Sequence, residues 1–259
     1  MNTLSTDVPL DHVVFYAGHQ LGELSAFAER LGFQLTPLGR HNSGSINRLA
    51  MLDGQYIELM GFEPGTPPTV RPEVQALPMG LNGVVAADRA TRVRRSKADG
   101  FLPPVYLERP VETPHAQGVA SFTITNVSEP PPDARAFMCR HHTPHLVWCE
   151  AWQHHPNGAV SVAEVCVPTR DPRRLHAAVR RIFDIEGDSS AAAYDAAGTR
   201  VRIASHESRG SLTVRVRDMG KALDVLQRSG LPYRRDEAGS VVVPLPQPYA
   251  VDLVFTAVR

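Results

Sequence analysis

The chain lacks an excess of either charge. Its 259 residues include 27 lysines and arginines and 27 aspartates and glutamates. A protein that binds nucleic acid through the phosphate backbone needs a basic surplus or a basic stripe. The short basic run at residues 92–95 falls where a helix is expected, and a solvated helix face explains it. We therefore predict no nucleic-acid partner.

Cysteine is also scarce. The three cysteines, Cys139, Cys149 and Cys166, are odd in number and show no Cys-x-x-Cys spacing. A disulfide framework is therefore not expected, and a reducing compartment fits. No apolar run is long enough to span a bilayer, and the N-terminal residues lack a basic start followed by an apolar core. We expect a globular, cytoplasmic protein with no membrane partner.

Several common catalytic motifs are missing as well. The sequence contains no phosphate-binding P-loop, no Gly-x-Ser-x-Gly nucleophile elbow and no dinucleotide-binding fingerprint. A functional site must therefore be sought among other residues, above all histidines and carboxylates.

A recurring order of secondary structure is present instead. Apolar residues alternate or recur at helical spacing in the order strand, helix, strand, strand, strand, which we write βαβββ. The elements expected in the first unit are a strand at 10–16, a helix at 21–31, and strands at 33–39, 46–52 and 56–60. After a proline-rich linker, the elements expected in the second unit are a strand at 81–87, a helix at 90–98, and strands at 101–107, 119–125 and 136–142.

The C-terminal part repeats the order in shorter form. Helical apolar stripes are expected at 175–183 and 222–228, each between weaker strands. A repeat of about 50 to 60 residues is typical of an architecture built from one supersecondary unit. We predict two domains, 8–157 with two full units and 158–259 with a second pair of degenerate units.

Two polar residues stand out within apolar strands. His12 lies among valines and leucine in the first strand, and Glu58 lies between isoleucine and leucine in the fourth. A buried polar group without a partner is costly. The partner is either a metal or substrate in a cupped sheet, or a hydrogen bond to a neighbouring group.

Three segments carry a resemblance to a known family. They are residues 10–14, 53–59 and 140–158. They resemble the glyoxalase-like group of the vicinal oxygen chelate superfamily, which includes glyoxalase I, extradiol dioxygenases and bleomycin-resistance proteins. The resemblance implies an α+β fold in which paired βαβββ units form cupped mixed sheets around a divalent metal.

The resemblance also implies where the metal ligands lie. His12 and Glu58 match the ligand positions of the first unit. In the second unit Gly83 occupies the first ligand position, so the remaining ligand must come from the last strand, which offers His141 and His142. Strand alternation favours His142 as the residue that faces the cleft, although a slip of one residue would select His141. The third unit has Arg202 at the position of Glu58, and an arginine cannot bind a cation.

Other residues are candidates for contacts with a substrate. Glu58 and His142 are the candidate catalytic residues, since either could exchange protons with a substrate. The candidate substrate-binding residues are Arg40, His41, Asn47, Arg140, Trp148 and Trp152. The two tryptophans either wall an apolar pocket or fix their loop to the sheet. The histidines between 141 and 155 either serve the site or belong to a solvated loop.

These expectations lead to one leading hypothesis and two alternatives. We predict a metal-dependent lyase, isomerase or dioxygenase that acts on a small vicinal-oxygen or aromatic substrate, with Fe, Mn, Zn or Ni as the ion. One alternative is a non-catalytic protein that sequesters a small molecule in the same cup. In the other, His12 and Glu58 only pair with each other. A homodimer is also expected.

Overall fold

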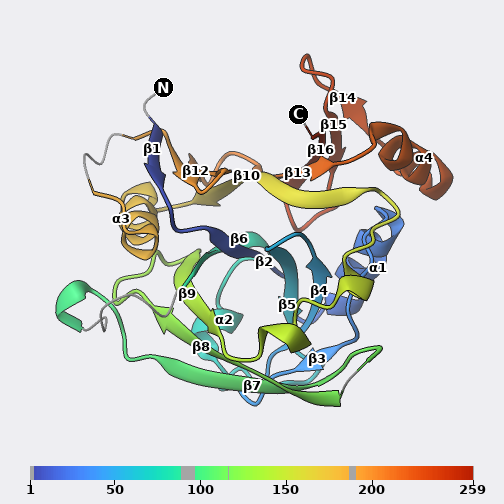
Figure 1. The fold of residues 1–259 in the computed structure, drawn as a ribbon. Helices are drawn as coiled ribbons and strands as arrows, with labels where there is room; N and C mark the ends of the chain where they lie inside the picture. The colour runs from blue at the N-terminus through green and yellow to red at the C-terminus, as the bar shows by residue number, and fades with distance from the viewer. Residues whose placement is uncertain (1–2, 89–96, 116, 187–190, 259) are drawn as a thin grey trace.

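The protein contains two eight-stranded mixed sheets, which lie one above the other (Figure 1). The structure is a computed structural model, and it describes residues 3–88, 97–115, 117–186 and 191–258. We call the sheet built from residues 10–141 the first sheet. The second sheet is built from residues 159–257 together with a strand at residues 3–6.

The first sheet contains both N-terminal units. Its strand order is β3-β4-β5-β2-β6-β9-β8-β7. The strands are β2 (Leu10–Tyr16), β3 (Gly39–Arg40), β4 (Ile46–Met51), β5 (Tyr56–Gly61), β6 (Gly80–Ala87), β7 (Val105–Glu112), β8 (Gln117–Asn126) and β9 (Arg135–His141). The first strands of the two units, β2 and β6, run antiparallel at the centre of the sheet and join the units.

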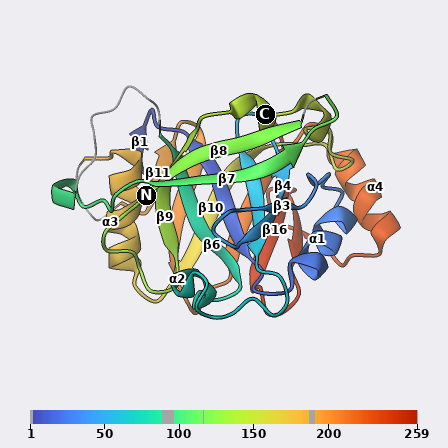
Figure 2. The ribbon, with the colours of Figure 1, turned by 90° about the horizontal axis from the view of Figure 1, so that it is seen from below.

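This sheet curves into a nearly closed cup. Its two edge strands, β3 and β7, approach each other. Beside them the backbone N–H of Asn42 donates to the carbonyl of Glu108 over 3.1 Å. Figure 2 shows β7 and β8 lying across the other strands of the sheet. The concave face of the first sheet therefore encloses a space.

Strand β2 is covered on both faces. All seven of its residues are buried, as expected for a strand between two packed layers. Val13 and Phe15 face the core between the two sheets, whereas Val14 and Tyr16 belong to a cluster on the cup side. The alternation along this part of the strand thus places His12, Val14 and Tyr16 on the cup side.

The second sheet has the strand order β1-β11-β12-β10-β13-β16-β15-β14. Its strands are β1 (Thr3–Thr6), β10 (Ala159–Thr169), β11 (Ala193–Ala196), β12 (Thr199–Ser205), β13 (Gly210–Val216), β14 (Arg234–Arg235), β15 (Val241–Pro244) and β16 (Val251–Ala257). Strands β10 and β13 are antiparallel at its centre, as β2 and β6 are in the first sheet.

The strand β1 was not expected from the sequence. Outward from β2 the first unit has β5, β4 and β3, and outward from β10 the third unit has β12, β11 and β1. The N-terminal strand therefore occupies the edge position that β3 takes in the first unit. It pairs with β11 in parallel, with Thr3 opposite Ala193, whereas β3 pairs with β4 antiparallel.

Three of the four helices described below, α1, α3 and α4, lie at the sides of the two sheets, whereas the short α2 is drawn near the middle of the view (Figure 1). They are α1 (Leu21–Arg30), α2 (Pro72–Gln75), α3 (Pro172–Phe183) and α4 (Met219–Ser229). The helix α3 begins at Pro172, and the Asp171 side chain accepts a hydrogen bond from the backbone N–H of Arg174 over 3.0 Å. Such a start satisfies a backbone N–H that the helix itself cannot. Among the described residues, no helix is long and apolar enough to cross a membrane.

Two predicted strands differ from the structure. Residues 33–39 were expected to form a strand, but only Gly39–Arg40 does. The backbone N–H groups of this segment bond elsewhere: Phe33 donates to the Ala28 carbonyl and Gln34 donates to the His155 ring. The strand expected at residues 101–107 begins only at Val105.

Proline explains the second difference. Pro103 and Pro104 precede β7, and proline cannot donate to a strand ladder. Phe101 forms an isolated bridge with Val127, outside the named strands. The helix expected at residues 90–98 lies mostly outside the described residues, and its described end forms a 3₁₀ turn at Lys97–Asp99.

Candidate active site

The cup of the first sheet holds the candidate site. The cavity has a volume of about 550 Å³, which includes the part open to solvent. Its apolar wall includes Leu107, Phe122, Ile124 and Phe137. Its polar lining includes His12, His41, Asn47, Glu58, Arg71, Arg109, Arg135 and His141.

His12 is held rigidly on β2. Its Nδ1 lies 2.6 Å from Oδ1 of Asp11, and its Nε2 lies 3.7 Å from Oε2 of Glu58. The Tyr56 ring stacks on the imidazole, with 4.3 Å between ring centroids and 13° between planes. Adjacent strand residues normally point to opposite faces, but the pairing of β2 with β6 shifts register between Leu10 and His12. This irregularity accompanies the close contact between Asp11 and His12.

Glu58 is a buried carboxylate on β5. Asn47 donates from Nδ2 to Oε1 of Glu58 over 2.7 Å. Burial alone would raise the pKa of Glu58, but the charges of His12 and His41 and the bond from Asn47 outweigh it and lower the pKa. Glu58 is therefore ionised at neutral pH, and its Oε2 faces Nε2 of His12.

His41 is a neutral neighbour of this pair. Burial lowers the pKa of His41 to about 4. The charge of Glu58 raises this pKa, whereas the charges of Arg109 and Arg71 lower it further. Its Nδ1 lies 3.0 Å from the Ser45 hydroxyl, and its Nε2 lies 3.5 Å from Nδ2 of Asn47. His41 therefore contacts Asn47 and is neutral at neutral pH, and only its charged form, which appears in acid, lowers the pKa of Glu58.

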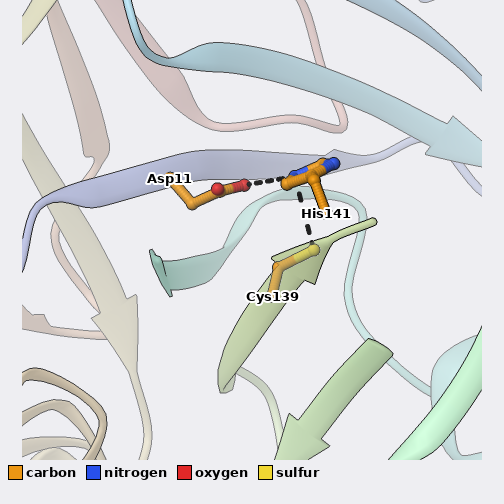
Figure 3. Close-up of side chains that lie close together, drawn as sticks. All are labelled: Asp11, Cys139 and His141. Atoms are coloured by element: carbon orange, nitrogen blue, oxygen red, sulfur yellow. Dashed lines mark hydrogen bonds and ion pairs between the residues drawn. The ribbon is translucent and has the colours of Figure 1, made fainter. Parts of the chain in front are cut away.

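A second polar cluster consists of Asp11, Cys139 and His141 (Figure 3). Nε2 of His141 lies 3.2 Å from Oδ1 of Asp11 and 3.5 Å from Sγ of Cys139. One donor atom from each of the three residues lies within 4.8 Å of the others, so this group could hold a metal ion. Nδ1 of His141 is buried and has no hydrogen-bond partner within the described part of the chain.

Asp11 and Cys139 differ in charge at neutral pH, because their pKa values are shifted in opposite directions. Burial would raise the pKa of Asp11, but His141 and His12 outweigh it and hold the pKa well below its usual range. Burial raises the pKa of the Cys139 thiol well above its ordinary value, and the charges of Asp11 and Glu58 raise it further. Asp11 is therefore an anion shared by two imidazoles, and Cys139 is a neutral thiol.

The prediction that His142 faces the cleft is wrong. His142 is exposed, its Nε2 lies 2.8 Å from the Thr123 hydroxyl, and its ring stacks on Tyr106. His141 lines the cup instead. His141 shares a face of β9 with Phe137 and Cys139, and this apolar face lines the cup, whereas Met138 on the other face lies in the core between the sheets.

The remaining candidates divide between the cup and its surroundings. Asn47 and His41 line the cup. Arg40 does not, since its exposed side chain pairs with Glu63 over 2.8 Å. Arg140 also points away, and its Nη2 lies 2.9 Å from Oδ2 of Asp88.

The two tryptophans contact the wall from outside. The ring of Trp148 lies 4.7 Å from that of His141 and 5.9 Å from that of Tyr56. Trp152 is buried in a cluster with Leu49 of β4. Of the two alternatives for these residues, their contacts match the one in which they fix the loop to the sheet.

Sequence reasoning missed several residues of the cup. Asp11, Tyr56, Arg71, Arg109 and Arg135 were not singled out, yet all but Asp11 line the cavity. One signal was available for Arg109. Arg109 alternates with Leu107 and Val111 on the buried face of β7, where an arginine is unexpected.

Two of the expected ligands, His12 and Glu58, are placed as ligands of a divalent metal could be, whereas the three-donor group found among the described residues is Asp11, Cys139 and His141. Nε2 of His12 and Oε2 of Glu58 face each other at 3.7 Å, and two ligands of one ion with bonds of about 2.1 Å lie at a comparable separation. A metal-binding histidine ordinarily donates its other N–H to a carboxylate, as His12 does to Asp11. The second unit offers no ligand at Gly83, where a Cβ would lie 2.6 Å from the Val14 side chain.

Comparison with known proteins places the chain in a family. The sequence pattern of the family described as "Glyoxalase-like domain" matches residues 10–183. The chain belongs to this glyoxalase-like domain family. The match includes both units of the first sheet and continues through α3. No curated protein matches the sequence significantly.

Solved structures share the fold at low sequence identity. A hypothetical protein from Staphylococcus aureus is 12% identical, with a TM-score of 0.64 over 97% of this chain and 100% of that chain. A mutant of 4-hydroxymandelate synthase from Streptomyces coelicolor is 13% identical, with a TM-score of 0.56 over 97% of this chain and 93% of that one.

A xylose isomerase-like TIM barrel/4-hydroxyphenylpyruvate dioxygenase fusion protein is 13% identical, with a TM-score of 0.50 over 100% of this chain and 50% of that one. The expected fold class, repeated βαβββ units in cupped mixed sheets of the vicinal oxygen chelate type, is confirmed.

Proposed function

We propose that this glyoxalase-like protein is a metal-dependent enzyme that acts on a small oxygenated substrate in the cup. His12 and Glu58 bind the ion, and His141 takes the place predicted for His142. The observation that carries the proposal is the arrangement of His12, whose Nδ1 is held by Asp11 while its Nε2 faces the ionised Glu58 at 3.7 Å.

The residues of the chain have distinct tasks in this proposal. Asp11 holds the proton on Nδ1 of His12 and so keeps Nε2 free as a donor. Asn47 holds Oε1 of Glu58 and leaves Oε2 toward the cup. The rings of Phe122 and Phe137 exclude water around the substrate. A bound divalent ion would polarise vicinal oxygens of the substrate as a Lewis acid.

The same site suits a lyase, an isomerase or a dioxygenase. Each of these needs an ion with open coordination positions beside a group that can carry a proton. Because Glu58 is ionised and faces the cavity, it can exchange a proton with the substrate. The dioxygenase fusion protein shares the fold, so a dioxygen-dependent reaction is the first to assay.

Metal content tests the proposal directly. The protein is purified without added metal, and its metal is measured before and after incubation with Fe²⁺, Mn²⁺, Zn²⁺ or Ni²⁺. We expect about one equivalent in the wild type for the preferred ion. His12→Ala, Glu58→Gln and His141→Ala should lose it, whereas the control His142→Ala should retain it because His142 is exposed outside the cup.

A negative result has a clear form. Less than roughly a tenth of an equivalent in the wild type, with no effect of His12→Ala, would contradict a metal centre built on ligands of this kind. That result would favour a non-catalytic binding protein, which the apolar wall of Leu107, Phe122 and Ile124 also suits. Such a protein would bind an aromatic compound equally well with and without His12.

A further inference from the structure

The cup carries more positive charge than the proposed metal centre explains. Three arginines, Arg71, Arg109 and Arg135, line it against one carboxylate, Glu58. The arginines come from three different parts of the first sheet and its linker: the N-terminal end of α2, β7 and β9. A bound divalent cation would increase this excess, so the charges call for an anion in the cup.

Arg109 is the most informative of the three. It is only 5% exposed, yet none of the described residues gives its guanidinium a hydrogen bond or a carboxylate within 4.0 Å. A buried charge without a partner is strongly unfavourable, and arginine is rarely buried unless paired. An anionic ligand would supply the missing partner.

The neighbouring strand leaves room for this side chain. Gly39 on β3 lies against it, and a Cβ at Gly39 would lie 2.9 Å from Nη1 and 3.0 Å from Cδ of Arg109. A residue with a side chain would displace Arg109 from this position. The glycine therefore permits a guanidinium at a place where the surrounding contacts do not satisfy it.

Arg135 and Arg71 extend the positive surface. The guanidinium carbon of Arg135 lies over the Phe137 ring, 4.5 Å from its centroid. Burial lowers the pKa of Arg135 to about 10, and the charge of Arg71 contributes in the same direction. Arg71 is the better satisfied, with the Ser45 hydroxyl at 3.2 Å from Nη1 and a Glu73 oxygen at 3.6 Å from Nε.

We infer that the cup binds a small organic carboxylate, whose carboxylate group is held by Arg109 and Arg135 and whose apolar body lies against Leu107, Phe122 and Ile124. The planar guanidinium matches a carboxylate with two parallel hydrogen bonds. The apolar wall favours a singly charged organic acid over a strongly hydrated inorganic dianion. This inference rests on the proposed function only in calling the ligand a substrate.

Binding to the full-length wild-type protein is the first test. Phenylacetate is compared with its neutral analogue phenylacetamide, and inorganic phosphate is tested alongside, by calorimetry or ligand-observed NMR. The protein is used as purified and again after chelation, so a missing metal centre would not affect the result. We expect phenylacetate to bind at least about tenfold more tightly than the amide, since charged hydrogen bonds contribute that much or more.

Variants then separate a ligand-binding arginine from a structural one. Arg109→Met should reduce phenylacetate binding about 10- to 100-fold and leave binding of the amide unchanged. Because it removes an unpaired buried charge, it should raise the melting temperature of the ligand-free protein or leave it unchanged. Arg135→Met should also weaken phenylacetate binding.

The matched control is Arg48→Met. Arg48 donates from Nε to the Thr36 carbonyl over 3.0 Å and pairs with Glu29, outside the cup. Its loss should lower the melting temperature without changing the preference for the carboxylate.

Three results would overturn the inference. The wild type could bind phenylacetate no more tightly than the amide, or it could bind phosphate as tightly as phenylacetate. The third is an Arg109→Met protein that is destabilised like Arg48→Met and keeps the wild-type preference for the carboxylate. If Arg109→Met fails to fold, Arg109→Lys keeps the charge and should show a reduced but measurable preference.

Discussion

At the scale of single residues, the site depends on which of two adjacent histidines faces the cup. His141 contacts Asp11 and Cys139, whereas His142 contacts Thr123 and Tyr106 on the outside. In a strand, a shift of one position moves a side chain to the opposite face. Sequence alone offered both residues, and the choice failed because both faces of β9 are apolar.

Asp11 provides a test at the same scale. It accepts a hydrogen bond from His12 and contacts His141, so its carboxylate orients both rings. We expect Asp11→Asn to weaken metal binding about 10- to 100-fold, as for other residues that orient a metal-binding histidine. Titration of the metal-free protein with the preferred ion, followed by calorimetry, measures the change.

Asp88→Asn is the control for this experiment. It removes an ion pair with Arg140 outside the cup and should leave metal affinity unchanged. Circular dichroism of both variants would establish that they are folded. Metal affinity of Asp11→Asn within twofold of the wild type would show that Asp11 does not orient the ligands.

At the scale of elements, the segment 143–158 closes one side of the first sheet without regular strands. His155 connects it to the first unit: the backbone N–H of Gln34 donates to Nδ1 over 3.0 Å, and Nε2 donates to the Met51 carbonyl over 2.7 Å. The bond from Gln34 requires an unprotonated Nδ1, and the bond to Met51 requires a proton on Nε2, so the two together require a neutral imidazole. Burial lowers the pKa of His155, partly opposed by the bond to Met51.

The pH dependence of stability tests this role. As pH falls below about 6.5, the unfolded chain takes up a proton on His155 that the folded chain resists, so the wild type loses stability. His155→Gln should be less stable than the wild type at pH 7.5, by about 1 to 3 kcal/mol for disrupted buried hydrogen bonds. The difference should narrow at pH 5.5, because the variant lacks this proton uptake.

Urea unfolding at the two pH values measures the effect. His154→Gln is the matched control, because His154 is exposed beside His155. It should differ little from the wild type at either pH. A gap between the wild type and His155→Gln that widens at low pH would contradict the neutral imidazole.

Elements differed in how far sequence could predict them. The strands β2, β4, β5 and β6 were found, because their apolar residues form continuous runs or end at clear turns. The segment 33–38 looks equally apolar, but its backbone donors go to Ala28 and to the ring of His155, which is more than 100 residues away. Contacts of that range leave no local pattern.

At the scale of the whole molecule, the two sheets share one hydrophobic core. Residues of β2 and β6, including Val13 and Val84, belong to the same buried cluster as Val165 and Val214 of the second sheet. The four-unit repeat was visible in the sequence, and the resemblance to a known family implied the cup. The charged lining of the cup was not, since Arg71, Arg109 and Arg135 meet only after folding. The two-domain division and a homodimer remain predictions.

The N-terminal strand gives a test at this scale. Replacing residues 3–6 by Gly-Ser-Gly-Ser should lower the unfolding midpoint, because it removes Leu4 from the core and leaves β11 as an open edge. Open edges favour pairing between molecules, so light scattering should also detect more self-association. Ser5→Ala, at an exposed position of the same strand, should have neither effect. A variant as stable and monodisperse as the wild type would show that β1 is dispensable.

The place of β1 also sets an order of events during synthesis. Thr3 pairs with Ala193, which follows it by 190 positions, so the strand has no partner until the third unit has left the ribosome. At about 5 to 20 residues per second, that wait lasts roughly 10 to 40 s. The cup can close in the meantime, because its strands span only residues 10–141. We therefore expect the site-bearing sheet to fold first on the ribosome and the N-terminal strand to dock among the last parts of the chain.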